Sequence, residues 1–448
     1  MTRIPSSLLI LSLTAGLLAS CNSVTPSSLP DLSANRPGQM APRYDAVASV
    51  PLQAGDTAAS LQAASGGTVL AMNACAAGSC EALLGLNTSN SLSAQSVNSL
   101  SVRLGRTVTV EANRDAFSGG GELTATMGGS RAAWAGGSFL AWNGGSRAAW
   151  AGGDYAPIPQ NTQLWTAVHL QQAQTLAPNL GRGVVVAVID TGLDLNHAAF
   201  QGSLTDPTTW KDYYGGDAVP QDEGTLGTGG YGHGTNVAGI ILQIAPEAKI
   251  MPIRVLGPDG SGDVVNIASA ITWAVARGAQ VINLSLGSSK DSKVVQDAIK
   301  AATAKKVLIT SSAGNANVDK MTFPASASAH VDGILSVGSV SSLDIKSAFS
   351  NYDQEMQLVA PGESVYAPAP GNMMAAWSGT SQAAPMAAGA LALALGQTLK
   401  PSVTASGLLD KLSNTALNVY SLPGNKPYID KLGNGRIDLS NFLLQTVQ

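Results

Sequence analysis

Apolar residues follow two alternating patterns from about residue 154 to the end of the chain. Short runs such as residues 183–189 are continuous and rich in β-branched side chains, which is typical of strands buried on both faces of a parallel sheet. Longer apolar segments suit helices packed in an interior, and we expect such helices at residues 161–177, 237–244 and 382–395. The alternation predicts an α/β fold, a mostly parallel central sheet flanked by helices, over residues 154–448.

The preceding part of the chain has a different pattern. Residues 44–117 indicate a small α+β domain, with a helix and three strands expected at residues 57–64, 67–72, 82–87 and 106–113. Residues 118–153 contain Gly-Gly-Ser-Arg-Ala-Ala-Trp-Ala-Gly-Gly twice, and so much Gly favours a flexible linker. The repeated Trp and Arg also suit contacts with the catalytic domain or the cell envelope. Residues 21–43 are rich in Ser, Pro and Asn and are expected to form a tether.

Residues 1–20 have the pattern of an export signal. Arg3 precedes an apolar stretch, and Ser20 precedes Cys21. The sequence Leu-Ala-Ser-Cys at residues 18–21 resembles the lipobox of bacterial lipoproteins, in which the Cys becomes the lipidated first residue; an ordinary cleavage site followed by an incidental Cys is the alternative. We therefore expect an exported protein, held in the bacterial cell envelope through a lipidated Cys21 or released outside the cell.

The composition narrows the range of partners. Charged residues make up 12% of the 448 residues, the net charge is −4 and there is no basic tract, which argues against nucleic acid as a partner. After residue 20 no apolar stretch is long enough to span a bilayer. Cys75 and Cys80 are the other two cysteines, and outside the cytoplasm a small-loop disulfide between them is expected. Without a second Cys pair or a nearby His, a zinc site is not expected.

Three motifs far apart in the sequence carry candidate chemistry: Asp190-Thr-Gly, His233-Gly-Thr and Gly-Thr-Ser381. A serine hydroxyl is a weak nucleophile until an imidazole removes its proton, and the imidazole needs a carboxylate to fix its tautomer and stabilise its charge. Asp190 ends an expected strand, where open α/β sheets bind ligands, and the other two residues stand at expected helix starts. A Ser before a helix is most simply a helix cap. The presence of Asp190 and His233 favours an Asp-His-Ser triad instead.

At these residues the chain resembles the subtilisin-like serine proteases, or subtilases. The resemblance implies a serine endopeptidase that hydrolyses protein or peptide substrates through an acyl-enzyme intermediate. It implies that the amide of Asn315 lies in the oxyanion hole, and that the bond Phe323–Pro324 is cis. It also implies that three uncharged segments bind an extended peptide or flank the pocket for the side chain before the cut bond: Gly260, Ser261 and Gly262; Ser285, Leu286 and Gly287; and Ser312, Ala313 and Gly314. An apolar or uncharged side chain is therefore expected to be preferred before the cut bond.

The resemblance gives the amino-terminal domain a role as well. Residues 44–117 would be a propeptide, which assists folding and covers the cleft of its own enzyme, and the cut that releases it would fall in the 118–153 linker. The chain would then be made as a zymogen.

No cofactor is expected to be required. Many subtilases hold calcium tightly, but Ala199 stands where that site needs a carboxylate, so we expect this site to be missing. The sequence leaves room for a weak structural calcium ion near Asp217, Asp222 and Glu223.

Three other functions fit parts of the sequence. An aspartic protease needs two Asp-Thr-Gly aspartates that share a proton, and only Asp190 stands in such a motif. An α/β-hydrolase needs Gly-x-Ser-x-Gly and the chain order Ser, Asp, His, whereas this chain has the order Asp, His, Ser. The third alternative is a catalytically silent surface binding protein on a subtilase scaffold. The intact triad and Asn315 argue against it.

Overall fold

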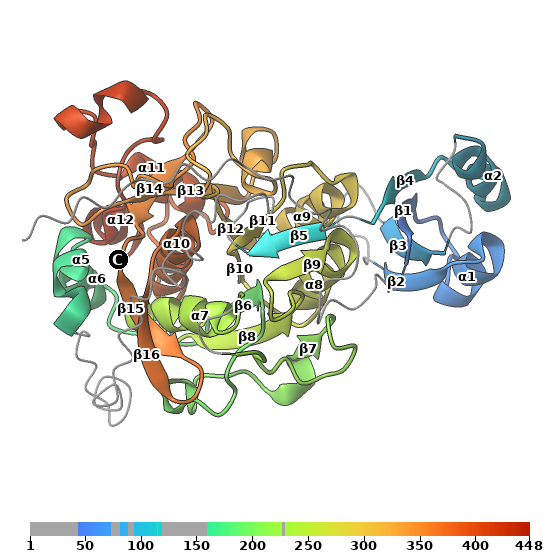
Figure 1. Ribbon diagram of the computed structural model, residues 1–448, viewed down its shortest axis with the longest axis horizontal. Helices are drawn as coiled ribbons and strands as arrows, with labels where there is room; N and C mark the ends of the chain where they lie inside the picture. The colour runs from blue at the N-terminus through green and yellow to red at the C-terminus, as the bar shows by residue number, and fades with distance from the viewer. Residues whose placement is uncertain (1–43, 73–80, 88–93, 114, 119–158, 226–228) are drawn as a thin grey trace, which may run out of the picture. The chain divides into compact units, whose positions relative to one another are not determined.

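The computed structural model describes residues 44–72, 81–87, 94–113, 115–118, 159–225 and 229–448, which all belong to one compact unit, residues 38–448. Over these ranges, no helix is both long enough and apolar enough to cross a membrane. Figure 1 shows the arrangement of the helices and strands.

A seven-stranded sheet forms the centre of the carboxyl-terminal domain (Figure 1), and all of its neighbouring strands are parallel, which confirms the expected fold class. Its strands, in spatial order, are β14 (Leu358–Pro361), β13 (Ile334–Val340), β12 (Leu308–Ser312), β10 (Val281–Leu284), β6 (Val185–Asp190), β8 (Lys249–Arg254) and β7 (Lys211–Asp212). The earliest strand in the chain, β6, lies inside the sheet, with β8 on one side and β10 on the other. The strand order therefore reverses beside β6, and such sheets bind ligands at the carboxyl ends of the strands at this point.

Helices cover both faces of this sheet, which explains why an inner strand such as β6 is apolar up to its last residue. Helices α7 (His233–Ile244) and α10 (Thr380–Leu395) share one core with Val186 and Val188 of β6. Helices α8 (Val264–Ala276) and α9 (Lys293–Ala304) share the other core with Ala187 and Ile189, because successive side chains of a strand point to opposite faces. Helices α11 (Leu408–Asn414) and α12 (Leu439–Thr446) also contribute to the first core.

Two helix boundaries differ from the expectation. The helix expected over residues 161–177 is two helices, α5 (Thr162–Ala167) and α6 (Leu170–Leu176). His169 between them has φ 57°, a left-handed conformation that a right-handed helix cannot include. Helix α10 begins one residue before Ser381, and its N-cap is Gly379. The interpretation of Ser381 as a simple helix cap is therefore wrong, since this residue lies inside the first turn.

A smaller α+β unit precedes this domain. Its antiparallel sheet has the order β2 (Thr68–Met72), β3 (Glu81–Leu86), β1 (Ala46–Pro51) and β4 (Thr109–Ala112), and its two helices are α1 (Ala58–Ser65) and α2 (Ala94–Leu104). The sequence predicts three of these strands and α1 but misses β1 and α2, and β4 is shorter than expected. Leu61 of α1, Leu100 of α2 and Leu84 of β3 share one apolar core.

Two small sheets and five short helices complete the described structure. Strand β5 (Asp115–Ser118) lies between β11 (Leu286–Gly287) and β9 (Ser261–Asp263) and is antiparallel to both. Strands β15 (Val365–Ala369) and β16 (Met373–Trp377) form a hairpin. The 3-10 helices span Pro159–Asn161, Ala198–Phe200, Pro207–Thr209, Ala325–Ala329 and Pro423–Tyr428.

Candidate active site

Asp190 is the last residue of β6, at the carboxyl edge of the central sheet. Its side chain is buried, and Oδ1 accepts hydrogen bonds from the main-chain N–H of Thr191 and from Nδ1 of His233, both at 2.7 Å. An ionised carboxylate only accepts hydrogen bonds, so the proton of a neutral His233 ring lies on Nδ1 and Nε2 is left as an acceptor. This is the tautomer that a general base needs.

His233 is the first residue of α7, and two glycines allow it to lie against the sheet. Gly232 has a left-handed φ of 88°, and a Cβ there would lie 2.6 Å from Cδ of Pro370. A Cβ on Gly234 would lie 2.2 Å from the carbonyl oxygen of Gly192. Gly234 therefore allows the start of the helix to approach the end of β6, and Gly232 allows the same turn to approach Pro370.

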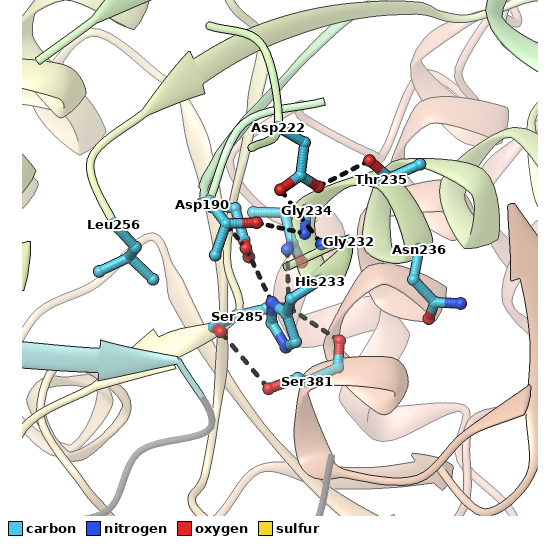
Figure 2. Close-up of polar contacts among 12 residues, drawn as sticks. Asp190, Asp222, Gly232, His233, Gly234, Thr235, Asn236, Leu256, Ser285 and Ser381 are labelled. Carbon is cyan, nitrogen blue, oxygen red and sulfur yellow. Dashed lines mark hydrogen bonds and ion pairs between the residues drawn. The ribbon is translucent and has the colours of Figure 1, made fainter. Parts of the chain in front are cut away.

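Ser381 is fully buried in the first turn of α10, and Figure 2 shows the imidazole of His233 between Asp190 and Ser381. The Ser381 hydroxyl donates to the carbonyl oxygen of Ser285 at 3.4 Å, and the Ser285 hydroxyl donates to the carbonyl oxygen of Ser381 at 2.8 Å. Nε2 of His233 is buried and has no hydrogen-bond partner within the described ranges. Bonds between a nucleophile and its base are often long before substrate binds, so this geometry is compatible with a triad at rest.

Asn315 lies in the loop after β12 and is buried. Its Oδ1 accepts hydrogen bonds from the main-chain N–H and the hydroxyl of Thr380, at 2.8 and 2.9 Å. These bonds fix the amide with its oxygen turned toward the start of α10. The nitrogen, which can donate to an oxyanion, is therefore the end directed away from Thr380.

The two segments expected to flank the specificity pocket follow neighbouring strands. Ser285–Gly287 come after β10, and Ser312–Gly314 begin at the last residue of β12. Because β10 and β12 are parallel neighbours, the two segments lie side by side at the carboxyl edge. All six residues are buried, and none carries a charge.

Strand β5 occupies the place where the sequence predicts an added peptide strand. Phe117 lies opposite Gly287 on one side and Ser261 on the other, and Ala116 lies opposite Gly262. Main chain of this same protein thus pairs with both segments that are expected to bind an extended peptide. The strand runs to Ser118, across the expected domain boundary at residue 117.

Other expected features have different outcomes. The Phe323–Pro324 bond is cis, as expected. Cys21, Cys75, Cys80 and the Trp-containing repeats lie outside the described residues, so lipidation and the disulfide stay predictions.

The acidic side chains named for a weak calcium site each have a partner within the protein. Asp217 accepts from the main-chain N–H of Val219 at 2.7 Å, and Glu223 pairs with Arg254 at 2.8 Å. Both carboxylate oxygens of Asp222 accept bonds from α7. Within the described part of the chain, no group of three or more His, Cys, Asp or Glu side chains could hold a metal ion.

Sequence reasoning missed the side chains that surround His233. Asp222 was assigned only to a calcium ion, although its contacts are with Gly232 and Thr235. The ring of Trp377 packs edge-on against the imidazole, with 5.9 Å between the ring centroids. Trp377 comes from the β15–β16 hairpin, and no sequence pattern connects that hairpin with His233.

Comparisons with known proteins agree with this geometry. The subtilase family matches residues 181–439. Subtilisin DY from Bacillus licheniformis is 34% identical over 248 residues, which is 53% of this chain and 85% of that protein. Subtilisin Savinase from Lederbergia lenta is 35% identical over 254 residues, 54% of this chain and 86% of that protein. A solved structure of a protease from Pseudoalteromonas arctica PAMC 21717 matches with a TM-score of 0.53 and 26% identity, over 64% of this chain and 98% of that one.

Proposed function

The chain belongs to the subtilase family and is a serine endopeptidase, and from this premise we propose that Asp190, His233 and Ser381 are its catalytic triad. The observation that carries the proposal is the bond from His233 Nδ1 to Asp190 Oδ1 at 2.7 Å, with the imidazole between Asp190 and Ser381 (Figure 2). The three residues come from β6, α7 and α10, far apart in the sequence, and no structural need of the fold requires an acid, a base and a hydroxyl at one point.

In the proposed mechanism, Nε2 of His233 takes the proton of the Ser381 hydroxyl while Oγ attacks the carbonyl carbon of the substrate. His233 then gives this proton to the leaving amine, and an acyl-enzyme remains. A water molecule releases the acid by the same proton transfers in reverse order. The Nδ1 proton stays on the ring and is donated to Asp190 throughout, and the carboxylate of Asp190 stabilises the imidazolium while it exists.

The negative charge of the tetrahedral intermediate falls on the former carbonyl oxygen. We assign its stabilisation to the amide nitrogen of Asn315 and to the main-chain N–H of Ser381, in the first turn of α10. The positive end of the α10 dipole acts in the same direction.

For the substrate, we propose an extended peptide that takes the place of β5 between Gly260–Gly262 and Ser285–Gly287. The pairing of β5 with these segments supports this mode of binding, because it uses main-chain bonds that any peptide can make. The uncharged character of Ser285–Gly287 and Ser312–Gly314 favours an apolar or uncharged side chain before the cut bond.

Occupation of the cleft by the chain itself supports a zymogen. Glu111 of the α+β unit accepts from the main-chain N–H of Lys293 at 2.7 Å and from the Ser292 hydroxyl, so a buried carboxylate also ties this unit to the start of α9. We propose that residues 44–117 act as a propeptide and that the self-cleavage site lies directly after Ser118. Ser118, the last described residue of β5, lies opposite Leu286, and the neighbouring Ser285 accepts a hydrogen bond from the Ser381 hydroxyl through its carbonyl oxygen.

We also propose that the protein is exported and anchored by a lipidated Cys21, on the strength of the Leu-Ala-Ser-Cys motif. Metabolic labelling with a radioactive fatty acid tests this: the wild-type chain should be labelled, a Cys21→Ser chain should not, and label retained on the Ser variant would refute it.

The catalytic proposal is tested with full-length Ser381→Ala and a matched Ser378→Ala control, three residues earlier on the chain. The Ser381→Ala protein should stay at full length and hydrolyse no peptide, while the control should mature and cleave normally. Maturation of the Ser381→Ala chain at the wild-type rate, in a host without other proteases, would exclude Ser381 as the nucleophile. A wild-type protein that stays inactive even after the propeptide is removed would favour the silent binding protein.

A further inference from the structure

Asp222 is a buried carboxylate beside the triad that the proposed mechanism does not use. It lies in the long segment between β7 and α7, and 2% of its surface is exposed. Figure 2 shows it beside the first turn of α7, across that turn from Ser381. Burial of an acid without pairing is costly, so its position calls for an explanation.

Both oxygens of Asp222 hold the first turn of α7. Oδ1 accepts from the main-chain N–H of Gly232 at 3.1 Å, and Oδ2 accepts from the hydroxyl of Thr235 at 2.7 Å. Gly232 is the N-cap of the helix and has no side chain with which to cap it. Asp222, which comes 10 residues before Gly232 in the chain, therefore acts as the cap of α7. Its two bonds, to Gly232 and Thr235, lie on either side of His233.

A second contact secures the same turn from the side of β6. The main-chain N–H of Gly234 donates to the hydroxyl of Thr191 at 3.0 Å, and the N–H of Thr191 donates to Asp190. The hydroxyl of Thr235 also accepts from the main-chain N–H of Asp194 at 2.9 Å. The main chain is thus fixed on both sides of His233, because Gly232 bonds to Asp222 and Gly234 bonds to Thr191.

Burial and the charges around Asp222 shift the pKa of its carboxyl. The pKa of this carboxyl is raised to about 7, chiefly by burial; the charge of Asp190 also raises the pKa, while the bonds from Gly232 and Thr235 and the charge of Arg254 lower it. Other titratable groups nearby are Tyr231 and His233 at the start of α7, Asp194 after β6, and Glu223 next along the chain.

We propose that Asp222 is a positioning residue for catalysis: its carboxylate fixes the first turn of α7, so that the imidazole of His233 stays against Asp190 and in reach of Ser381. The inference rests on the proposed role of His233 as the general base. Its geometric part predicts a loss of turnover when the two bonds are removed. Its electrostatic part predicts a pH effect when only the charge is removed.

Two substitutions separate these parts. Asp222→Asn keeps the shape, since the amide can still accept from Gly232 and can donate to the Thr235 hydroxyl, but it removes the charge. Asp222→Ala removes both bonds. We expect kcat of Asp222→Ala to fall by about 10- to 100-fold with KM little changed, because a small misplacement of a catalytic group has an effect of this size. Asp222→Asn should keep kcat near the wild-type value at alkaline pH.

The pH profile and a second pair of variants supply readouts that a purely structural role would leave unchanged. The acid limb of the kcat profile should move to lower pH in Asp222→Asn, because a negative charge that favours the imidazolium is gone. Thr235→Val should reproduce part of the Ala effect and Thr235→Ser should restore activity. Asp332→Asn, an exposed acid remote in sequence, is the control for charge and should behave as wild type.

All rates are divided by the number of active sites, counted with a serine-directed phosphonate, so that unfolded protein does not count as lost turnover. An Asp222→Ala enzyme with wild-type kcat per active site, or an unchanged pH profile in Asp222→Asn, would overturn the proposal. If His233→Ala itself kept full activity, the proposed function would fail instead, which distinguishes the two failures.

Discussion

Replacement of Asp222 by Asn should change how the stability of the folded chain depends on pH. The carboxyl has a pKa of about 7 in the folded chain, raised from 3.8, chiefly by burial. An acid with a raised pKa binds its proton more tightly in the folded state, so protonation of Asp222 stabilises the fold. This stabilisation is complete below about pH 4 and is lost as the pH rises to about 7. At about 1.4 kcal/mol for each pKa unit, the loss is about 4 kcal/mol. An Asn side chain does not titrate and shows no such loss.

The assay is urea unfolding of full-length Ser381→Ala protein, which cannot digest itself, with and without Asp222→Asn, at several pH values from about 4 to 8. Relative to its parent, the Asn variant should gain about 4 kcal/mol in free energy of unfolding across this range. The exposed Asp332→Asn variant should show no pH-dependent difference. If the difference in free energy of unfolding between the parent and Asp222→Asn stayed constant over the whole range, the argument that burial raises the pKa of Asp222 would be refuted.

Three further outcomes are expected. Asn315→Ala should lower kcat by about 10²- to 10³-fold with KM little changed, a range known from subtilisin itself, and stopped-flow or steady-state kinetics that show less than a threefold loss would remove Asn315 from the oxyanion hole. Hydrolysis should rise with pH as His233 loses its proton, since only the neutral imidazole can accept the proton of Ser381; a flat rate between about pH 5 and 9 would contradict this. Thermal melts in calcium and in chelator should nearly coincide, because Ala199 offers no ligand, and a shift of about 10 °C or more traced to the residues around Ala199 would prove the expectation wrong.

Sequence reasoning reached the fold and the triad because each depends on local patterns. A strand buried on both faces is apolar over its whole length, so the sequence predicts β6 and its end at Asp190. The same holds for α7, which begins at His233 as the glycines and the following apolar run indicate.

The errors arise where a contact from elsewhere decides the conformation. His169 bonds through its ring to Asp438 at 3.0 Å, and this partner comes 269 residues later in the chain, so the break between α5 and α6 has no local sign. Asp222 shows the same limit. Its role depends on a bond to Gly232, 10 residues away, and the sequence of a loop does not predict which atoms its side chains contact.

Labelling of the self-processed wild-type protein with a serine-directed phosphonate, followed by peptide mass spectrometry, tests the central claim most directly. The account predicts one adduct, on Ser381, and no adduct in His233→Ala, because the hydroxyl reacts only when the imidazole accepts its proton. An adduct on another serine, or continued peptide hydrolysis with Ser381 unlabelled, would contradict the assignment of Asp190, His233 and Ser381 as the catalytic triad.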